Sequence, residues 1–278
     1  MNPATEPLPD ERLQRFARAV EERFGLSFPP RRQADLERGL RQAFAASTCQ
    51  DLDEYYCLIQ DPQAGALEMD RLVNALTVGE TYFFRDAGQF NALYDHILPD
   101  IIERRRSVRV LRLWSAGCAS GEEPLTLALA LTEAGWMERL PIEIRASDAS
   151  EALLDKARAG VFRERSFRAL PPVLQAKYFE PNGSGWCVAP QILRAVSWQT
   201  ANLTVEADVA ALATADIIFC RNVFIYFSDA ATAKVVNTFY RLMPSPGYLF
   251  VGTSESLLRL GTRFELEDIG NTFVYVKH

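Results

Sequence analysis

A change in hydrophobic pattern near residue 108 constrains the fold of this chain more than any other feature of its sequence. Beyond this point, apolar segments of strand length alternate with amphipathic segments of helix length. Alternation of this kind predicts an α/β fold with a doubly wound, mainly parallel sheet. The expected strands are residues 108–114, 142–148, 215–220, 247–253 and 272–277, and the expected helices are 122–135, 150–160 and 230–243.

The first hundred residues show helical periodicity only. In ERLQRFARAVEERF, residues 11–24, apolar side chains recur at the spacing of one helix face, and a Pro-Pro pair at 29–30 ends the segment. We therefore expect an all-helical domain at residues 1–85 and an α/β domain at residues 86–278. The Gly-rich turn in FEPNGSGWCV predicts a small β hairpin inserted into the α/β domain at about residues 176–200.

Composition excludes several classes of function. A formal net charge of −6 does not suit a nucleic-acid-binding protein. Five cysteines without a CxxC pair argue against a disulfide framework and a zinc site, and two histidines argue against a multi-histidine metal site. The N-terminus lacks the layout of a signal peptide, and no apolar run approaches the roughly 18 residues of a membrane span. We expect a cytoplasmic protein that holds no metal.

The candidate ligand site lies where the expected strands end, because doubly wound sheets bind ligands at the carboxyl ends of their strands. A glycine-rich loop, Gly117–Gly121, follows the first strand and leads into a helix that opens with Glu122 and Glu123. Its GxxxG spacing differs from the GxGxxG of dinucleotide-binding loops. The other polar or aromatic residues at or after strand ends are Asp148, Asn202, Arg221, Asn222 and Tyr226.

Carboxylates at the start of this helix would repel a phosphate and favour a cation. The pattern therefore suits an adenosine whose far end is positively charged, and S-adenosylmethionine, with a sulfonium, an ammonium and no phosphate, has this chemistry. Asp148 is placed to accept hydrogen bonds from ribose hydroxyls. Each residue also has a structural alternative: the two glutamates would stabilise the helix dipole, Asp148 would cap the next helix, Asn222 would bond to a turn and Tyr226 would pack in the core.

The segment TVGETYFFRD, residues 77–86, precedes the sheet and has no obvious place in this pattern. Its two phenylalanines would ordinarily be core residues and Arg85 a surface partner of Asp86. With WSAGCASGEEP, SDASEALLDKARAG, NL, IFCRNVFIYF and GYLFVGTSESL, however, it resembles the chemotaxis receptor methyltransferases, the CheR family. These blocks occur in the order and approximate spacing of the family, from about residue 10 to 277.

The resemblance implies a class I S-adenosylmethionine-dependent methyltransferase fold and the methylation of glutamate side chains on chemoreceptors. Carried over by position, its cofactor contacts are Thr81, Arg85, Glu123, Asp148, Asn202, Leu203, Arg221 and Asn222, and the glycine-rich loop adds Gly117. Arg85 and Tyr226 would line the place where the methyl group meets the acceptor carboxylate. The sequence departs from the family at Gly79, Leu125 and Ala149-Ser150, none of which is a cofactor contact.

The implied partner is the cytoplasmic helical bundle of chemoreceptors, reached by a monomer that meets the membrane only through the receptor. Eight arginines within residues 12–41 form a candidate docking surface for an acidic partner, although a solvated helix face is the simpler interpretation. The inserted hairpin looks shorter and less glycine-rich than in family members that bind a receptor's C-terminal pentapeptide, so we expect no dependence on that pentapeptide. The alternatives are a class I methyltransferase acting on another substrate and a non-catalytic adaptor that senses the cofactor.

Overall fold

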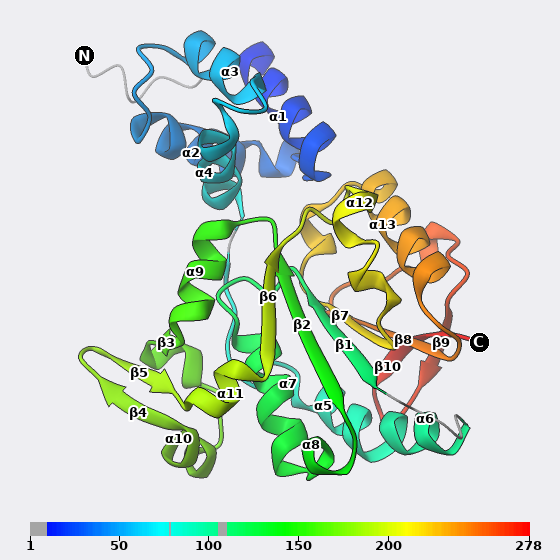
Figure 1. Ribbon diagram of the computed structural model, residues 1–278. Coiled ribbons are helices and arrows are strands. Elements are labelled where there is room, and N and C mark those ends of the chain that lie inside the picture. Colours follow the sequence, from blue (N-terminus) through cyan, green and yellow to red (C-terminus); the bar gives the residue numbers. More distant parts are fainter. Residues whose placement is uncertain (1–9, 78, 105–109) are drawn as a thin grey trace. The chain divides into compact units, whose positions relative to one another are not determined.

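The computed structural model describes residues 10–77, 79–104 and 110–278 and divides into two compact units. The helical unit comprises the described residues of Met1–Gly79 together with Tyr226–Thr232, and the sheet unit comprises those of Glu80–Ile225 and Ala233–His278 (Figure 1). The division between the units falls after Gly79, whereas the sequence placed the boundary after Arg85. The reason is Phe83, which is fully buried in the sheet unit.

The helical unit is built on four helices, each with one apolar face. They are α1 (Asp10–Phe24), α2 (Gln33–Ala45), α3 (Leu52–Gln60) and α4 (Ala66–Leu76), with a 3-10 turn at Pro30–Arg32. Leu13, Phe16 and Val20 lie on one face of α1 and are buried in the core of this unit. Gly39 lets α2 and α4 approach closely, because a Cβ at this position would lie 2.7 Å from the carbonyl oxygen of Ala75.

A distant segment of the chain, Tyr226–Thr232, completes the helical unit. The backbone N–H of Ser27 donates to the carbonyl of Tyr226 at 2.8 Å, and that of Ser228 donates to the carbonyl of Gly25 at 3.0 Å. Leu26 and Phe227 form an isolated antiparallel bridge between these hydrogen bonds. No local pattern indicates this pairing, because the two segments lie about two hundred residues apart.

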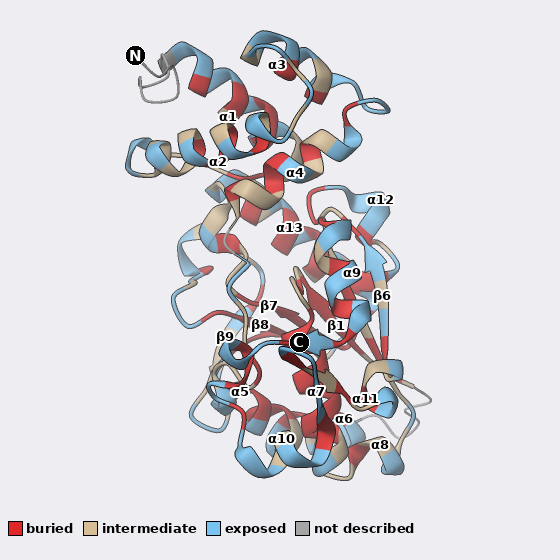
Figure 2. Ribbon diagram, turned by 90° about the vertical axis from the view of Figure 1, so that its left-hand side faces the viewer, coloured by how far each residue is buried: buried red, intermediate tan, exposed pale blue. Residues whose placement is uncertain are grey.

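The sheet unit contains a seven-stranded sheet of order β6-β2-β1-β7-β8-β10-β9. The neighbours β6, β2, β1, β7 and β8 are parallel, and β10 is antiparallel to both β8 and β9. Figure 2 shows β7 and β8 as buried strands at the centre of this unit. The strands are β1 (Leu111–Ala116), β2 (Ile142–Asp148), β6 (Val196–Thr200), β7 (Ile217–Cys220), β8 (Gly247–Val251), β9 (Glu265–Asp268) and β10 (Phe273–Lys277).

This arrangement confirms the predicted fold class, a doubly wound, mainly parallel sheet with an all-helical N-terminal part. The main helices of the sheet unit are α5 (Ala87–Ala92), a π-helical turn (Leu93–Ile97), α6 (Leu98–Arg104), α7 (Glu122–Glu133), α9 (Glu151–Ala159) and α13 (Asp229–Leu242). Shorter helices are α8 (Trp136–Arg139), α10 (Pro172–Tyr178), α11 (Pro190–Arg194) and α12 (Glu206–Val209). Within the described residues, none of the helices combines the length and apolarity that a membrane crossing requires.

The inserted hairpin is present but belongs to a slightly different segment from the one expected. A small sheet of order β3-β5-β4 joins β3 (Val161–Phe162) to the two hairpin strands, β4 (Phe179–Asn182) and β5 (Gly185–Val188). Residues 196–200, which the expected insert included, instead form β6 at the edge of the main sheet. The small sheet is held by an aromatic cluster in which Phe83 contacts Phe162 and Phe179, with ring centroids 4.9 and 5.0 Å away.

Candidate functional site

Four neighbouring parallel strands end at the same edge of the sheet, and each delivers a residue that the sequence proposed. The order β6-β2-β1-β7 places Asn202, Asp148, Gly117 and Arg221 along this edge, although the strands occur in a different order in the chain. The site therefore lies where the parallel topology brings distant loops together.

The loop between β1 and α7 has a backbone shape that only small residues allow. Gly117 and Gly121 have φ values of 75° and 96°, in the left-handed region that side chains rarely adopt. A Cβ on Gly121 would also lie 2.9 Å from the ring of Trp198. Asp148 fixes the loop from the neighbouring strand, because its Oδ2 accepts the backbone N–H of Ala119 at 2.9 Å. The carboxylate of Asp148 thus lies at the strand end where the site is expected and also holds the glycine-rich loop in its conformation.

The two glutamates at the start of α7 have different environments, and this corrects the sequence interpretation that both face the ligand. Glu122 is buried and its carboxylate accepts hydrogen bonds from the hydroxyls of Ser120, at 2.7 Å, and Ser166, at 2.8 Å. Glu123 accepts the hydroxyl of Ser115 at 2.7 Å and lies 3.5 Å from the guanidinium of Arg221. Consecutive helix residues point about 100° apart, so one carboxylate faces the protein interior and the other the site.

Arg221 connects three parts of the site. Its Nη2 donates to the carbonyl oxygen of Arg85 at 2.6 Å and to the carboxylate of Asp86 at 2.9 Å, and its Nη1 lies 3.5 Å from Glu123. The side chain is 2% exposed. An arginine this deeply buried requires compensating charge, which the two carboxylates supply. The arginine predicted as a cofactor contact is thus also the residue that joins the end of β7 to α7 and to the turn containing Arg85.

The segment TYFFRD forms a tight turn before α5. Phe84 and Asp86, on either side of Arg85, both have φ of 56°, which is uncommon for residues other than glycine. The backbone N–H of Phe84 donates to the hydroxyl of Thr126 on α7 at 3.1 Å. Arg85 itself makes one side-chain hydrogen bond, from Nη1 to the carbonyl of Glu80 at 3.0 Å. The turn is fixed through its backbone and the arginine side chain stays half-buried. Thr81, just before the turn, is also half-buried.

Asn202 and Leu203 follow β6. The Oδ1 of Asn202 accepts both the N–H and the hydroxyl of Thr204, at 3.0 and 2.8 Å, so this side chain shapes its own turn. Leu203 is 8% exposed and supplies an apolar contact at the same edge of the sheet. The structural alternative considered for an asparagine at this edge, a bond to a turn, therefore applies to Asn202.

Asn222 and Tyr226 lie on the loop after β7 and differ in their surroundings. Asn222 has φ of 59°, and its Oδ1 is buried without a hydrogen-bond partner among the described residues. A buried acceptor of this kind is rare and indicates a missing donor. Tyr226 packs within the helical unit, where the guanidinium of Arg32 lies 5.1 Å from its ring centroid. No pattern in the sequence indicates that this residue belongs to the helical unit.

Electrostatics favour a ligand that donates hydrogen bonds or carries positive charge. Burial raises the pKa of Glu123 above its usual value, although Arg221 and Ser115 oppose the shift. Burial likewise raises the pKa of Asp148, against the backbone N–H groups of Ser150, Ala119 and Ala149. With the unpartnered oxygen of Asn222, the site offers three acceptors from three different strand ends. These acceptors fit the ribose hydroxyls and the ammonium of an S-adenosyl group.

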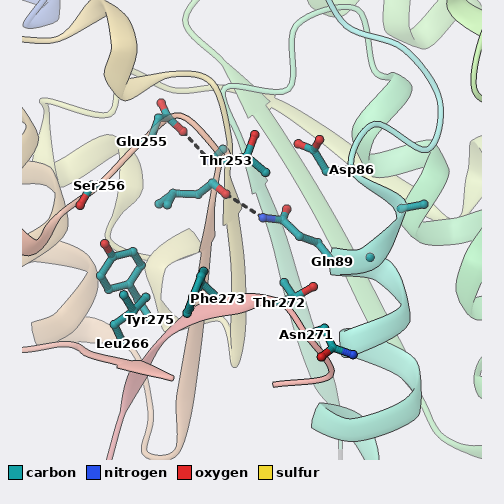
Figure 3. A pocket seen from close by; sticks show the side chains of 14 residues that line it. Asp86, Gln89, Thr253, Glu255, Ser256, Leu266, Asn271, Thr272, Phe273 and Tyr275 are labelled. Atoms are coloured by element: carbon teal, nitrogen blue, oxygen red, sulfur yellow. Dashed lines mark hydrogen bonds between the residues drawn. The ribbon is translucent and has the colours of Figure 1, made fainter. Parts of the chain in front are cut away.

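Glu255 is a residue that the sequence analysis quoted within a motif but did not assign to the site. Its carboxylate accepts the backbone N–H groups of Asn222, Gly252 and Ile225 at 2.7, 2.6 and 3.1 Å. It also lines a cavity of about 520 Å³, drawn in Figure 3, whose other walls include Asp86 and Gln89. A charged residue flanked by serines after an apolar strand was the available signal. In the described residues, no group of three or more His, Cys, Asp or Glu is arranged to hold a metal.

Comparison with known proteins gives matches over nearly the whole chain. The family model "CheR methyltransferase, SAM binding domain" matches residues 79–273, and "CheR methyltransferase, all-alpha domain" matches residues 11–77. The chain is 35% identical to chemotaxis protein methyltransferase 2 of Vibrio cholerae over 95% of its own length and 91% of that protein. It is 32% identical to chemotaxis protein methyltransferase 1 of Pseudomonas aeruginosa, over 92% and 94% of the two chains.

Proposed function

Because the chain belongs to the CheR methyltransferase family, we propose that it transfers the methyl group of S-adenosylmethionine to glutamate side chains of chemoreceptors, giving γ-glutamyl methyl esters. The observation that carries this proposal is the match of both the SAM binding domain and the all-alpha domain, since a methyltransferase of the same fold for small molecules has no need of the second. The predicted cofactor, S-adenosylmethionine, is confirmed by the family match.

The residues that would hold the cofactor are those at the four strand ends. We propose that Asp148 binds the ribose hydroxyls, that Leu203 contacts the adenine, and that Glu123 and Asn222 accept hydrogen bonds from the charged end. Gly117 keeps the loop close to the ligand, and Thr81, Arg85, Asn202 and Arg221 complete the carried-over set. The cofactor supplies an electrophilic methyl group on a positively charged sulfur.

The acceptor needs alignment rather than a base. A glutamate carboxyl with a pKa of about 4.3 is already ionised near neutral pH. As its oxygen forms the new O–C bond, the S–C bond breaks in line and the electron pair stays on sulfur. Arg85 would hold the incoming carboxylate through its other oxygen, and Tyr226 would donate a hydrogen bond or pack beside the methyl group. Alignment and exclusion of water are then the main sources of rate enhancement.

We propose that the receptor docks on the arginine-rich face of the helical unit. Several of these arginines are already paired inside the unit: Arg12 and Arg15 with Asp53, Arg38 with Asp35, and Arg41 with Glu37. Arg31 is exposed and makes no ion pair among the described residues. The sequence also has five arginines within residues 104–112. Arg104 pairs with Asp100 and Arg112 with Glu143, while residues 105, 106 and 109 lie outside the described residues.

Reversing the charge of Arg31 is expected to raise the KM for receptor by severalfold and to leave the affinity for S-adenosylhomocysteine unchanged. The reason is that long-range attraction between the docking face and an acidic helix is lost while the cofactor site is not touched. Arg32 is unsuited to this test, because its guanidinium stacks on Phe28 and Tyr226 and donates to the carbonyl of Ser27. Arg163→Glu, a charge reversal in the sheet unit, is the control. An unchanged KM in Arg31→Glu would argue against docking on this face.

The inserted hairpin supports independence from a receptor tail. Its strands contain four residues each and are joined by Gly183-Ser184 alone. This leaves little edge on which an added peptide strand would pair. Low-micromolar binding of a receptor C-terminal pentapeptide to the purified protein would contradict the proposal. We further propose that the protein acts in the cytoplasm as a monomer and approaches the membrane only through the receptor.

Affinity for S-adenosylhomocysteine is expected to fall severalfold between about pH 7.5 and about pH 5. In the proposed placement, the ammonium of this ligand binds ionised Glu123, and its ribose hydroxyls donate to ionised Asp148. Because the pKa values of Glu123 and Asp148 are raised, protonation begins at a higher pH than for ordinary carboxyls and removes that attraction. The same shifts act on folding in the opposite direction, since their stabilising contribution is present at low pH and is lost as pH rises through the folded-state pKa.

Calorimetric titration at several pH values measures this effect. Neutral adenosine is the matched control, because it lacks the ammonium and its affinity should change less. A flat profile for S-adenosylhomocysteine would show that neither carboxylate contributes its charge to the site.

Transfer of tritiated methyl groups tests the function directly. The protein is incubated with labelled S-adenosylmethionine and a panel of receptor signalling domains, and the label should appear as a base-labile ester on glutamate. Base-stable label, or label only in small molecules, would indicate a class I methyltransferase with another substrate. Tight cofactor and receptor binding without any transfer would indicate a non-catalytic cofactor-sensing adaptor.

A further inference from the structure

The motif GTSES, which follows β8, has no role in the function proposed so far. Its glutamate, Glu255, lies beneath the loop that follows β7, 30 or more residues away in the chain. One carboxylate oxygen accepts the N–H groups of Asn222 and Gly252, and the other accepts that of Ile225. Hydrogen bonds to an ionised acceptor are about twice as strong as neutral ones. A single side chain therefore fixes both ends of the loop that carries Asn222.

The conformation of Asn222 needs such support. Its φ of 59° lies in the left-handed region, which few residues other than glycine adopt. Glu255 binds the N–H of this same residue, so the carboxylate holds the backbone in the strained conformation. The consequence is a buried amide oxygen on Asn222 without a partner among the described residues. An unpaired acceptor at the carboxyl edge of the sheet is what a donor group of the cofactor would complete.

The space between Gly252 and the side chains of Asn222 and Glu255 is narrow. A Cβ added to Gly252 would lie 2.7 Å from the side-chain nitrogen of Asn222 and 2.8 Å from Oε2 of Glu255. Gly252 has no left-handed φ, so the position requires glycine for space and not for backbone freedom. The backbone N–H of Gly252 donates to the carboxylate of Glu255. Figure 3 shows Glu255 on the wall of the cavity, together with Thr253 and Ser256. A residue larger than glycine would have to displace the side chain of Asn222 or of Glu255.

We propose that Glu255 is a positioning residue for the cofactor, which acts by holding Asn222 in its left-handed conformation so that the amide oxygen faces the bound ligand. The inference rests on the proposed placement of the cofactor beside Asn222. The glutamate of the SES motif would thus have a function in cofactor binding, and Gly252 would provide the space that this arrangement needs. This role of Glu255 does not involve the carboxylate that receives the methyl group.

Binding of S-adenosylhomocysteine, measured by calorimetry well below the unfolding temperature, tests the proposal. Glu255→Gln loses at least one charged hydrogen bond, and Gly252→Ala adds a methyl group that displaces the side chains of Asn222 and Glu255 while the charge of the carboxylate is kept. Both variants are expected to bind the ligand about tenfold or more weakly. Ser256→Ala, an exposed neighbour on the same cavity wall, should bind as the parent protein does.

Tyr248→Phe controls for lost stability, because it removes the buried hydrogen bond to Asp100 at the other end of β8. It should lower the unfolding temperature without changing ligand affinity. Amide hydrogen exchange gives a second measurement, in which the N–H groups of Asn222 and Ile225 should lose protection in Glu255→Gln but not in Tyr248→Phe. If Glu255→Gln does not fold, Gly252→Ala carries the test, because it disturbs the same contact and keeps the charge of Glu255.

Asn222→Ala separates this inference from its premise. If Asn222→Ala binds weakly while Glu255→Gln and Gly252→Ala bind within about twofold of the parent protein, the positioning role is overturned and the cofactor site stands. If Asn222→Ala binds normally, the cofactor does not use this residue, and the inference is overturned because its premise fails.

Discussion

Replacing Arg85 with alanine is expected to lower the rate of methyl transfer roughly 30- to 1000-fold, the usual cost of about 2–4 kcal/mol for removing one transition-state contact. Cofactor binding should persist, because the backbone of this residue, and not its side chain, bonds to the rest of the site. The carbonyl of Arg85 accepts the bond from Arg221, and alanine keeps that carbonyl. The side chain contributes a single hydrogen bond to Glu80, so its loss leaves the turn intact.

Single-turnover kinetics with saturating receptor and calorimetry with S-adenosylhomocysteine separate the two effects. Arg168→Ala is the matched control, because the guanidinium groups of Arg85 and Arg168 lie 5.5 and 3.6 Å from the ring centroid of Tyr82, and both residues bond to Glu80. If packing on Tyr82 were the cause, both variants would lose activity alike. Near-normal turnover in Arg85→Ala would remove the arginine from the mechanism.

Replacing Arg221 with methionine is expected to destabilise the sheet unit by about 3–5 kcal/mol, because it leaves a buried carboxylate without its counter-charge. Glu123 is 13% exposed and Asp86 28% exposed, and the guanidinium of Arg221 forms an ion pair with each of them. Urea unfolding followed by tryptophan fluorescence measures the change. All four tryptophans of the chain (114, 136, 186 and 198) belong to the sheet unit.

An exposed pair provides the comparison. Arg241 and Glu206 are each more than half exposed, so Arg241→Met should cost no more than about 1 kcal/mol. The double variant Arg221→Met with Glu123→Gln should recover part of the lost stability, because it also removes one of the uncompensated charges. A loss for Arg221→Met as small as that for Arg241→Met would mean that the two carboxylates find other partners or solvent.

Local pattern was sufficient for the fold class and for part of the site. Strand and helix periodicity depend on neighbours a few residues apart, so the alternation after residue 108 predicted the parallel sheet. The parallel topology in turn predicted that Asp148, Gly117 and Arg221 would meet at one edge. The motifs identified the family and, with it, the cofactor.

Other features depend on contacts between residues far apart in the chain, and only the tertiary structure decided them. Adjacent glutamates at 122 and 123 look equivalent in sequence, yet one bonds to Ser166 and the other faces Arg221. Arg221 and Asp86 are 135 residues apart in the chain. Tyr226 packs within the helical unit, although the sequence assigned it to the α/β domain.

The sequence by itself determined the sheet, the family and the residues that end the strands, because these follow from local periodicity and from motifs. The tertiary structure decided which carboxylate faces the candidate site and which residue supports the loop after β7. Those choices depend on side-chain direction and on hydrogen bonds between distant strands, such as the bonds of Glu255, and no local pattern encodes them.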